Sequence, residues 1–273
     1  MDILEFLIRK LEQEQKLVLK EIQRYHGSLN WFGIVFRVTK QFLTSFCDAM
    51  SIAQKEVLFF PRRHNVLTRD LIFDCRYLKS FIKEDPKVSF DFLLGKLKKN
   101  DFRLQSDAAT SWGWGGVLLF NTPRNGLNGL FCQQSWAQLA NIFEIPDLLP
   151  QHAKSGVGEL TGALFTRESF LDFCGDSLTI QESDNSGVVA WIEKGRVTKR
   201  PWDRMAQKLA MVCLARSAKF WARHIPRELN RPADLASKKP QGQYMRIDGL
   251  VFKRVRPKFS ICLQLLRTAT RRR

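Results

Sequence analysis

The sequence predicts a mixed α/β protein, in which a mixed five-stranded sheet flanked by helices follows a small all-α region. Two observations predict this arrangement. Apolar residues recur at helical spacing in the first part of the chain, and from Phe102 the period shifts to the alternation that is typical of strands. The polar stretch LKKNDF, residues 97–102, separates the two patterns, so we expect a domain boundary near residue 98.

Helices are predicted for the first part, residues 1–98. Residues 2–26 repeat apolar positions with charges between them, and YHGS at 25–28 predicts a break. A second helix is expected from Leu29 to about residue 50, and a third over 68–83 with Thr68 as its cap.

Strands dominate the start of the second part, residues 99–240. FRLQSDA, WGGVLLF and GLFCQQ predict three consecutive strands with short turns, an antiparallel meander, before a long connection over about 134–156. The elements expected after that connection are a helix over 158–174, a strand over 177–183, a short helix from Asn185, a helix over 201–217, a strand over 219–225 and a last helix from Arg231.

The composition favours a nucleic-acid partner. Forty-four Lys and Arg against 27 Asp and Glu give a net charge of +17, which suits a polyanion, although a generic basic protein has the same signature. Residues 241–273 are expected to form a basic C-terminal tail that neutralises phosphates without reading sequence.

The six cysteines form no CxxC pair, which argues against a zinc site and a disulfide framework. The N-terminus has acids where a signal peptide has bases, and no apolar run is long enough to span a membrane. We therefore expect an intracellular protein of the cytoplasm or nucleus that does not contact a membrane.

Four acids lie at the edges of predicted elements. Asp107 lies in the first strand, Glu159 opens the helix after the meander, Asp184 ends the fourth strand, and Asp234 lies in the first turn of the last helix. In this element order the first and fourth strands are expected to be neighbours, so the four carboxylates are expected to converge.

Converging carboxylates repel one another unless cations lie between them. Two Mg²⁺ ions, with Mn²⁺ as a substitute, would suit an all-oxygen site and can promote the cleavage of a phosphodiester. Taken singly, each acid also has a structural interpretation: Asp107 at a bulge, Glu159 and Asp234 as favourable charges at helix N-termini, and Asp184 as an N-cap.

The residues around the acids resemble a known family. SDAATSWGWGGVL, GELTGAL, ESDNSGVVAWI and HIPRELNRPADLASK look like the four signature blocks of an RNase H type 1 domain, as carried by retroelement reverse transcriptases of gypsy-like and DIRS-type elements. His224 stands ten residues before Asp234 and Asn230 four residues before it, as in the family's pattern. The resemblance covers roughly residues 100–240.

The resemblance implies an endoribonuclease that cuts the RNA strand of RNA–DNA hybrids with two metal ions. Asp107, Glu159, Asp184 and Asp234 would bind the metal, and His224, on a loop before the last helix, would assist proton handling or product release. Asn185 and Ser186 would shape the turn that presents Asp184. Glycines after Asp107 would allow the turn and let the hybrid approach, whereas Trp112 and Trp114 are expected to pack.

The upstream helices are similar to the region that follows a polymerase palm. EIQRYHGSLNWFGIVFRVTKQFLTSFCDAM and NVLTRDLIFDCRYLKSFI resemble thumb and connector helices. No Tyr-x-Asp-Asp turn is present, so no polymerase activity is expected from this chain alone. The palm and fingers portion of the same polyprotein is an expected partner.

The sequence differs from the family pattern in two respects, and two alternative functions remain open. The 52 residues from Asp107 to Glu159 are more than is usual in the family, and only two helices have room between Asp184 and His224, so no basic handle helix is expected there. One alternative is a catalytically silent remnant that binds nucleic acid. The other is an integrase- or resolvase-type nuclease of the same superfold, although such nucleases lack the His224, Asn230 and Asp234 ending.

Overall fold

The computed structural model describes residues 2–83, 102–120, 128–143, 156–174, 178–194, 206–207, 209–210, 213 and 219–258. The chain divides into two compact units, one of Met1–Leu93 with Lys194–Thr198 and one of Leu94–Glu193 with Lys199–Arg273. The boundary expected near residue 98 lies outside the described residues, as does most of the helix expected over 201–217.

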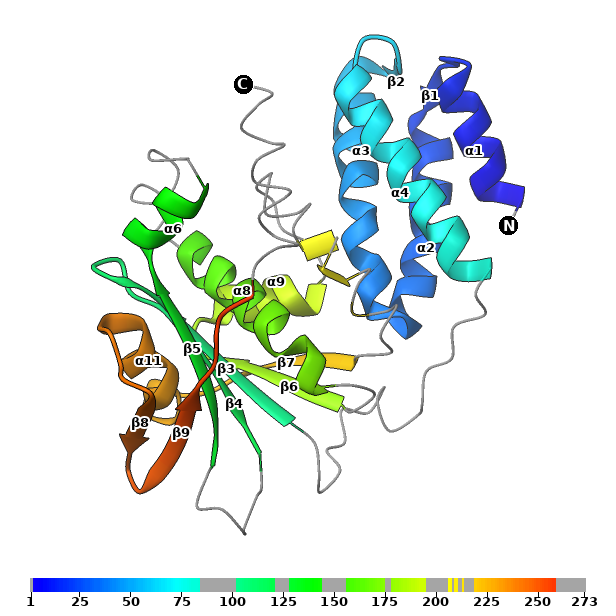
Figure 1. Cartoon of the computed structure of the whole chain (residues 1–273). Coiled ribbons are helices and arrows are strands. Elements are labelled where there is room, and N and C mark those ends of the chain that lie inside the picture. The colour runs from blue at the N-terminus through cyan, green and yellow to red at the C-terminus, as the bar shows by residue number, and fades with distance from the viewer. Residues whose placement is uncertain are drawn as a thin grey trace. The chain divides into compact units, whose positions relative to one another are not determined.

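The first unit consists of helices and one short pair of strands (Figure 1). Its helices are α1 (Asp2–Glu12), α2 (Leu19–Val35), the 3-10 helix η1 (Arg37–Leu43), α3 (Thr44–Glu56) and α4 (Asn65–Lys83). The strands β1 (Leu17–Val18) and β2 (Leu58–Phe59) pair antiparallel, with Leu17 opposite Phe59. Large apolar side chains from all of these elements fill the core between the helices, among them Leu7, Leu11, Leu17, Ile22, Phe42, Phe46, Phe59 and Leu71.

The helix break expected at residues 25–28 is wrong. Helix α2 runs through them because Tyr25 and Leu29 are both buried on its inner side, and this burial outweighs the roughly 1 kcal/mol that a helical glycine costs. Gly27 faces open space, where a β-carbon would touch nothing within 4 Å. The chain breaks earlier, between α1 and β1, where Glu14 has a positive φ of 53°.

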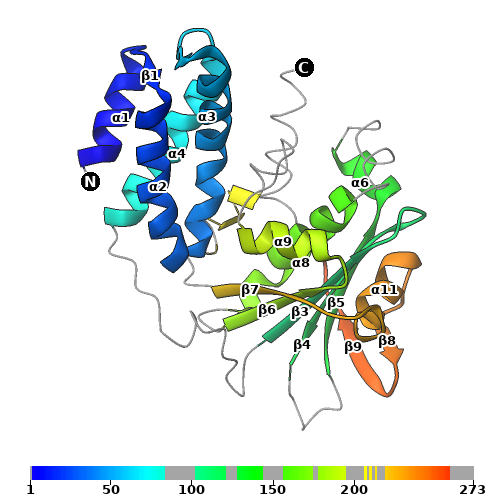
Figure 2. The same cartoon turned by 180° about the vertical axis from the view of Figure 1, so that it is seen from behind.

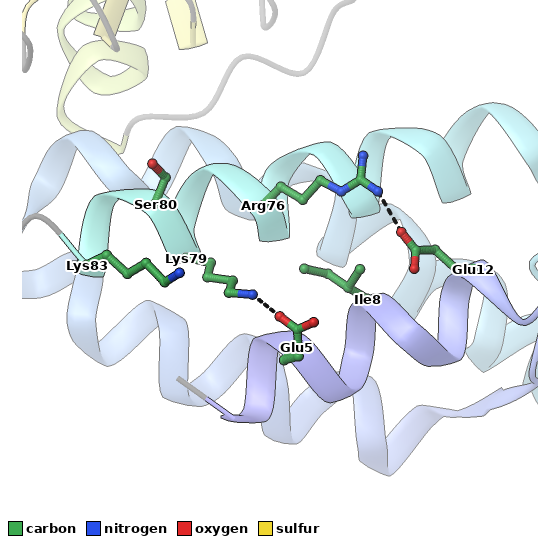
Figure 3. A pocket seen from close by; sticks show the side chains of 7 residues that line it. All are labelled: Glu5, Ile8, Glu12, Arg76, Lys79, Ser80 and Lys83. Carbon is green, nitrogen blue, oxygen red and sulfur yellow. Dashed lines mark hydrogen bonds and ion pairs between the residues drawn. The ribbon is translucent and has the colours of Figure 1, made fainter.

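Ion pairs join α1 to α4 at the surface of this unit (Figure 3). Arg76 donates to Glu12 over 2.6 Å, and Lys79 donates to Glu5. Ser80 and Lys83 line the same shallow groove. Both acids that line the groove are therefore neutralised by α4.

The second unit contains one mixed sheet of seven strands in the order β7-β6-β3-β4-β5-β9-β8. Strands β3 (Phe102–Ala108), β4 (Gly113–Leu119) and β5 (Gly129–Ser135) form the expected antiparallel meander, and β6 (Leu178–Ser183) lies parallel to β3. Strand β7 (Lys219–His224) continues the sheet parallel to β6. The first and fourth strands of this unit are therefore neighbours, as the sequence predicted.

The expected five strands become seven because residues assigned to the basic tail form a hairpin. Strands β8 (Tyr244–Ile247) and β9 (Leu250–Arg254) pair antiparallel, and β9 joins β5 in parallel. Asp248 and Gly249, with φ of 49° and 77°, make the two-residue turn between them. Met245 and Phe252 are buried against Phe131, Ala233 and Ala236, and this apolar contact anchors the hairpin to the sheet.

Helices cover both faces of the sheet (Figures 1 and 2). Helix α8 (Gly156–Cys174) packs on one face of β3 and β4, and α11 (Arg231–Lys238) packs on the other. Two shorter helices are α6 (Trp136–Phe143), within the long connection expected over about 134–156, and α9 (Ser186–Lys194) after β6. Within the described ranges, no helix combines the length and apolar character that crossing a membrane requires.

Two consecutive glycines of β4 let these helices come close. Neighbouring residues of a strand face opposite sides of a sheet. A β-carbon on Gly115 would lie 2.6 Å from the backbone of Ala236 in α11, and one on Gly116 would lie 2.2 Å from Thr166 Oγ1 in α8. The glycines were expected to admit the nucleic-acid backbone; instead, the chain's own helices fill the space, and both residues are buried.

Candidate active site

Strands β3 and β6 place two of the four acids side by side. Gln105 pairs with Glu182 in parallel register, so Asp107 and Asp184 each follow a paired residue by two positions at the same end of the sheet. Because alternate residues of a strand share a face, Gln105 and Asp107 both face α11. Ser237 of α11 donates a hydrogen bond to Asp107 Oδ2, which confirms that orientation.

Helix α11 and the residue before it hold both carboxylates in place. Asn230, fully buried just before the helix, donates to Asp184 Oδ1 over 2.9 Å and to the backbone carbonyl of Ser106 over 3.1 Å. Near the end of α11, Ser237 donates to Asp107 and also to the carbonyl of Asp234, the latter over 2.9 Å. A single short helix thus connects Asp107, Asp184 and Asp234.

Glu159 reaches the site from the first turn of α8. Gly162, one turn later, lies so close to β3 that a β-carbon there would be 3.3 Å from the carbonyl oxygen of Asp107. The Oε2 atom of Glu159 is buried and has no hydrogen-bond partner. Burial, followed by the negative charges of Asp107 and Asp184, raises the pKa of Glu159 to about 8.

The four carboxylates share one electrostatic environment. The pKa of Asp107 is also raised, first by burial and then by the charges of Asp184 and Asp234, while the hydrogen bond from Ser237 opposes the shift. The charges of Asp184 and Asp234 thus act on both Asp107 and Glu159. The convergence of the four acids on a metal site stays a prediction.

Two basic side chains occupy the Asp234 carboxylate. Lys238 Nζ lies 2.6 Å from Oδ2, and Arg227 Nη2 lies 3.3 Å from Oδ1. Among the described residues, no three His, Cys, Asp or Glu side chains are arranged to hold a metal ion as they stand. Cation binding by three or more of these residues would therefore require movement of the carboxylates and displacement of the basic groups.

The residues near Asp184 differ from the expectation in two respects, namely which residue caps α9 and where His224 lies. Asn185 Oδ1 accepts a hydrogen bond from the backbone N–H of Val188 over 3.1 Å, so Asn185 caps α9 and the Asp184 carboxylate remains available. His224 is the last residue of β7 rather than part of a loop, and its exposed ring places Nε2 3.1 Å from the backbone oxygen of Asp184. Trp114 is fully buried, as expected of a packing residue.

Sequence reasoning missed the polar residues that support the acids. On the same face, Gln105 Nε2 donates to Glu182 Oε2 and to the carbonyl of Leu229, each over 3.0 Å, and Arg223 donates to Glu182 Oε1. This network holds the segment that carries Arg227 and Asn230. The available signal was the polar residues at alternate positions of strands that are otherwise buried, namely Gln105, Asp107 and Glu182.

Comparisons with known proteins found similarity to solved structures alone. No protein-family model matches the chain, and no curated protein matches it. RNase H1 from the halophilic archaeon Halobacterium salinarum NRC-1 is 16% identical with a TM-score of 0.33, over 50% of this chain and 92% of that chain. The N-terminal RNase H domain of a Mycobacterium tuberculosis protein is 14% identical with a TM-score of 0.36, over 50% of this chain and 90% of that one.

LC11-RNase H1, solved in complex with an RNA/DNA hybrid, is 16% identical with a TM-score of 0.34, over 50% of this chain and 91% of that chain. At such identities and scores, the function of this chain has to be argued from the chemistry of its own site.

Proposed function

We propose that this chain is a ribonuclease H that hydrolyses the RNA strand of RNA–DNA hybrids. The observation that carries the proposal is the cluster of Asp107, Glu159, Asp184 and Asp234 at one end of the sheet, in which one buried carboxylate oxygen has no partner. A buried carboxylate oxygen without a donor, in an acid that lies among other acids, is costly to keep unless a ligand compensates for it.

The donor set fits a hard divalent cation such as Mg²⁺. All four groups are carboxylates, the ligands that such ions prefer, and the Glu159 Oε2 atom is a buried acceptor to which no protein group donates. Asp107, Glu159, Asp184 and Asp234 would hold the ions. Bound there, a pair of ions would supply electrostatic stabilisation of the charge that develops when a phosphodiester is hydrolysed.

The protein's own residues orient the reacting groups. Ser237 and Asn230 fix the carboxylates of Asp107 and Asp184 by hydrogen bonds. The exposed His224 ring, beside the Asp184 carbonyl, would assist proton handling or product release. The net charge of +17 provides backbone attraction to nucleic acid without base recognition.

We further propose that the chain is the C-terminal part of a retroelement reverse transcriptase, acting inside the cell beside a palm and fingers portion of the same polyprotein. Its support is the sequence resemblance of the four motif blocks and of the helices before them. RNA in a hybrid would be distinguished from DNA by its 2′-hydroxyls and by the shape of the minor groove.

Cleavage of a labelled hybrid by wild type and Asp184→Asn, with Mg²⁺ and with EDTA, tests the activity. We expect wild type to cut only with the metal and Asp184→Asn to lose about 10³-fold in rate, because removing a ligand removes stabilisation of the developing charge. Its stability should change little, since one fewer charge relieves repulsion. The matched control is Asp248→Asn in the turn between β8 and β9, which removes an exposed acid that pairs with Arg231.

Two results would contradict the proposal. Wild-type protein that binds the hybrid but leaves it intact would favour the silent nucleic-acid-binding remnant, to which the ion pairs of Asp234 with Arg227 and Lys238 lend some support. Cleavage of duplex DNA with none of the hybrid would favour an integrase- or resolvase-type nuclease.

A further inference from the structure

The Asp234 carboxylate is engaged on both oxygens by side chains that reach into solvent. Lys238 contacts Oδ2 from one turn further along α11, and Arg227 contacts Oδ1 from the 3-10 helix η2 (Arg227–Leu229). The Arg227 side chain is 69% exposed and that of Lys238 is 48% exposed, whereas Asp234 is 21% exposed. The two cations therefore cover the acid from the solvent side.

Arg227 responds to more acids than its immediate partner. The pKa of Arg227 is raised by its hydrogen bond and charge interaction with Asp234, and further by Asp184 and Asp107. Arg227 thus lies in the field of three of the four acids. In the absence of other cations, Arg227 and Lys238 supply the positive charge that the acid cluster attracts.

A divalent cation and these side chains would compete for the same oxygens. A cation bound by Asp234 needs Oδ1 or Oδ2, and each already accepts from a basic group. Long, exposed side chains lose little when they give up a surface ion pair, so they would swing aside readily. The displaced groups would stay beside the acids, where the proposed substrate brings a phosphodiester.

We propose that Arg227 and Lys238 are phosphate-binding residues of this site, held on Asp234 until a divalent cation takes its carboxylate. The proposal rests on the proposed function and adds the part of the protein that binds the scissile region of the backbone. Arginine and lysine are the side chains that most often bind phosphate oxygens, Arg through its planar fork and Lys as a point charge. Each side chain has one partner without the metal and another with it.

The proposal predicts opposite effects of one substitution on two ligands. Calorimetric titration with Mn²⁺ and no nucleic acid should give a dissociation constant about threefold lower in Arg227→Gln and in Lys238→Gln than in wild type, because a competitor has been removed. With Mn²⁺ present, binding of a hybrid whose RNA strand carries phosphorothioate linkages should weaken about threefold or more, and the logarithmic salt slope should fall by about 0.9 per side chain. In EDTA the loss of hybrid affinity should be smaller.

Arg231→Gln is the matched control. It removes the same charge from α11, the helix that carries Lys238, but Arg231 pairs with exposed Asp248 over 2.8 Å and not with any of the four acids. Unchanged Mn²⁺ affinity in both test variants, or hybrid losses equal to those of Arg231→Gln, would overturn the inference. Wild-type protein that binds neither Mn²⁺ nor hybrid would instead overturn the proposed function, so the two failures are distinguishable.

Discussion

Two glutamates of the second unit, Glu182 and Glu159, show how differently a protein can treat a buried acid. Glu182 on β6 is 1% exposed, yet Gln105 donates to one of its oxygens and Arg223 to the other. Glu159 on α8 is less buried as a residue, but its Oε2 has no hydrogen-bond partner and its charged neighbours are other acids. Burial alone therefore does not distinguish a supporting acid from a candidate ligand.

The difference lies in the missing partner. A buried carboxylate that accepts from a guanidinium and an amide is structurally complete. A carboxylate that has one buried oxygen without a donor and lies among like charges has a place for a ligand, and burial and those charges raise its pKa. The comparison can be tested by substituting Glu182, whose oxygens both accept hydrogen bonds, or Glu159, whose Oε2 has no donor.

The largest expected effect on stability comes from substituting Glu182, the acid whose oxygens both have hydrogen-bond partners. Glu182→Gln should lower the free energy of unfolding by about 3 kcal/mol, because it breaks the ion pair of a buried carboxylate with half-exposed Arg223 and disturbs the hydrogen bond from Gln105. Urea unfolding at pH 7 measures it. Exposed Glu228→Gln is the control and should change stability by less than about 0.5 kcal/mol. A similarly small loss in Glu182→Gln would mean that the network is not structural.

A smaller effect is expected where α11 meets the sheet. Gly115→Ala should lower the free energy of unfolding by about 2 kcal/mol, because the added carbon would lie 2.6 Å from the backbone of Ala236 and push the helix outward. The hydrogen bond from Ser237 to Asp107 should lengthen as well, so hybrid cleavage per folded molecule should fall.

Gly242→Ala is the control for that variant, since a β-carbon at Gly242 meets nothing within 4 Å. Urea unfolding and hybrid cleavage are compared for the two variants. Equal behaviour of both would show that α11 does not need the close approach.

The smallest effect concerns Glu159 and pH. Because the folded pKa of Glu159 is about 8 against an ordinary value of 4.5, its contribution to stability is fully present below about pH 4.5 and is lost as the pH rises through about 8. In EDTA, wild type should therefore lose about 1–2 kcal/mol more than Glu159→Gln between pH 5 and pH 8, a value reduced for solvent screening.

Divalent cations should remove this difference, because a ligand that binds the ionised carboxylate lowers its pKa. Thermal unfolding of both proteins at the two pH values, with EDTA and with Mg²⁺, is the measurement. Parallel pH profiles of the two proteins in EDTA would mean that Glu159 is not the unsatisfied acid.

Much of the second unit could be predicted from the sequence because its signals are local. Alternating residues indicated the strands around Asp107 and Asp184, and the order of the elements predicted that these strands are neighbours. The hairpin of β8 and β9 had a usable signal, the pair Asp248-Gly249 between alternating residues, but the density of basic residues favoured a tail. The basic composition was given more weight than the turn signal, and the hairpin was therefore missed.

Other features depend on tertiary contacts that no local pattern contains. Helix α2 continues through Gly27 because Tyr25 and Leu29 meet a core formed by distant segments. The bond from Ser237 to Asp107 joins residues 130 positions apart, and the ion pairs of Asp234 were not predicted either. Sequence reasoning identified the four acids, but not the residues that hold or neutralise them.

The adjacent glycines of β4 have a mechanical consequence. Helix α11 rests on Gly115 and helix α8 rests on Gly116, from opposite sides of one strand. Any shift of this short piece of backbone must carry both helices with it, and with them Asp234 and Glu159. The spacing between these two acids therefore depends on how closely both helices pack on this buried strand rather than on the solvent-facing ends of the helices.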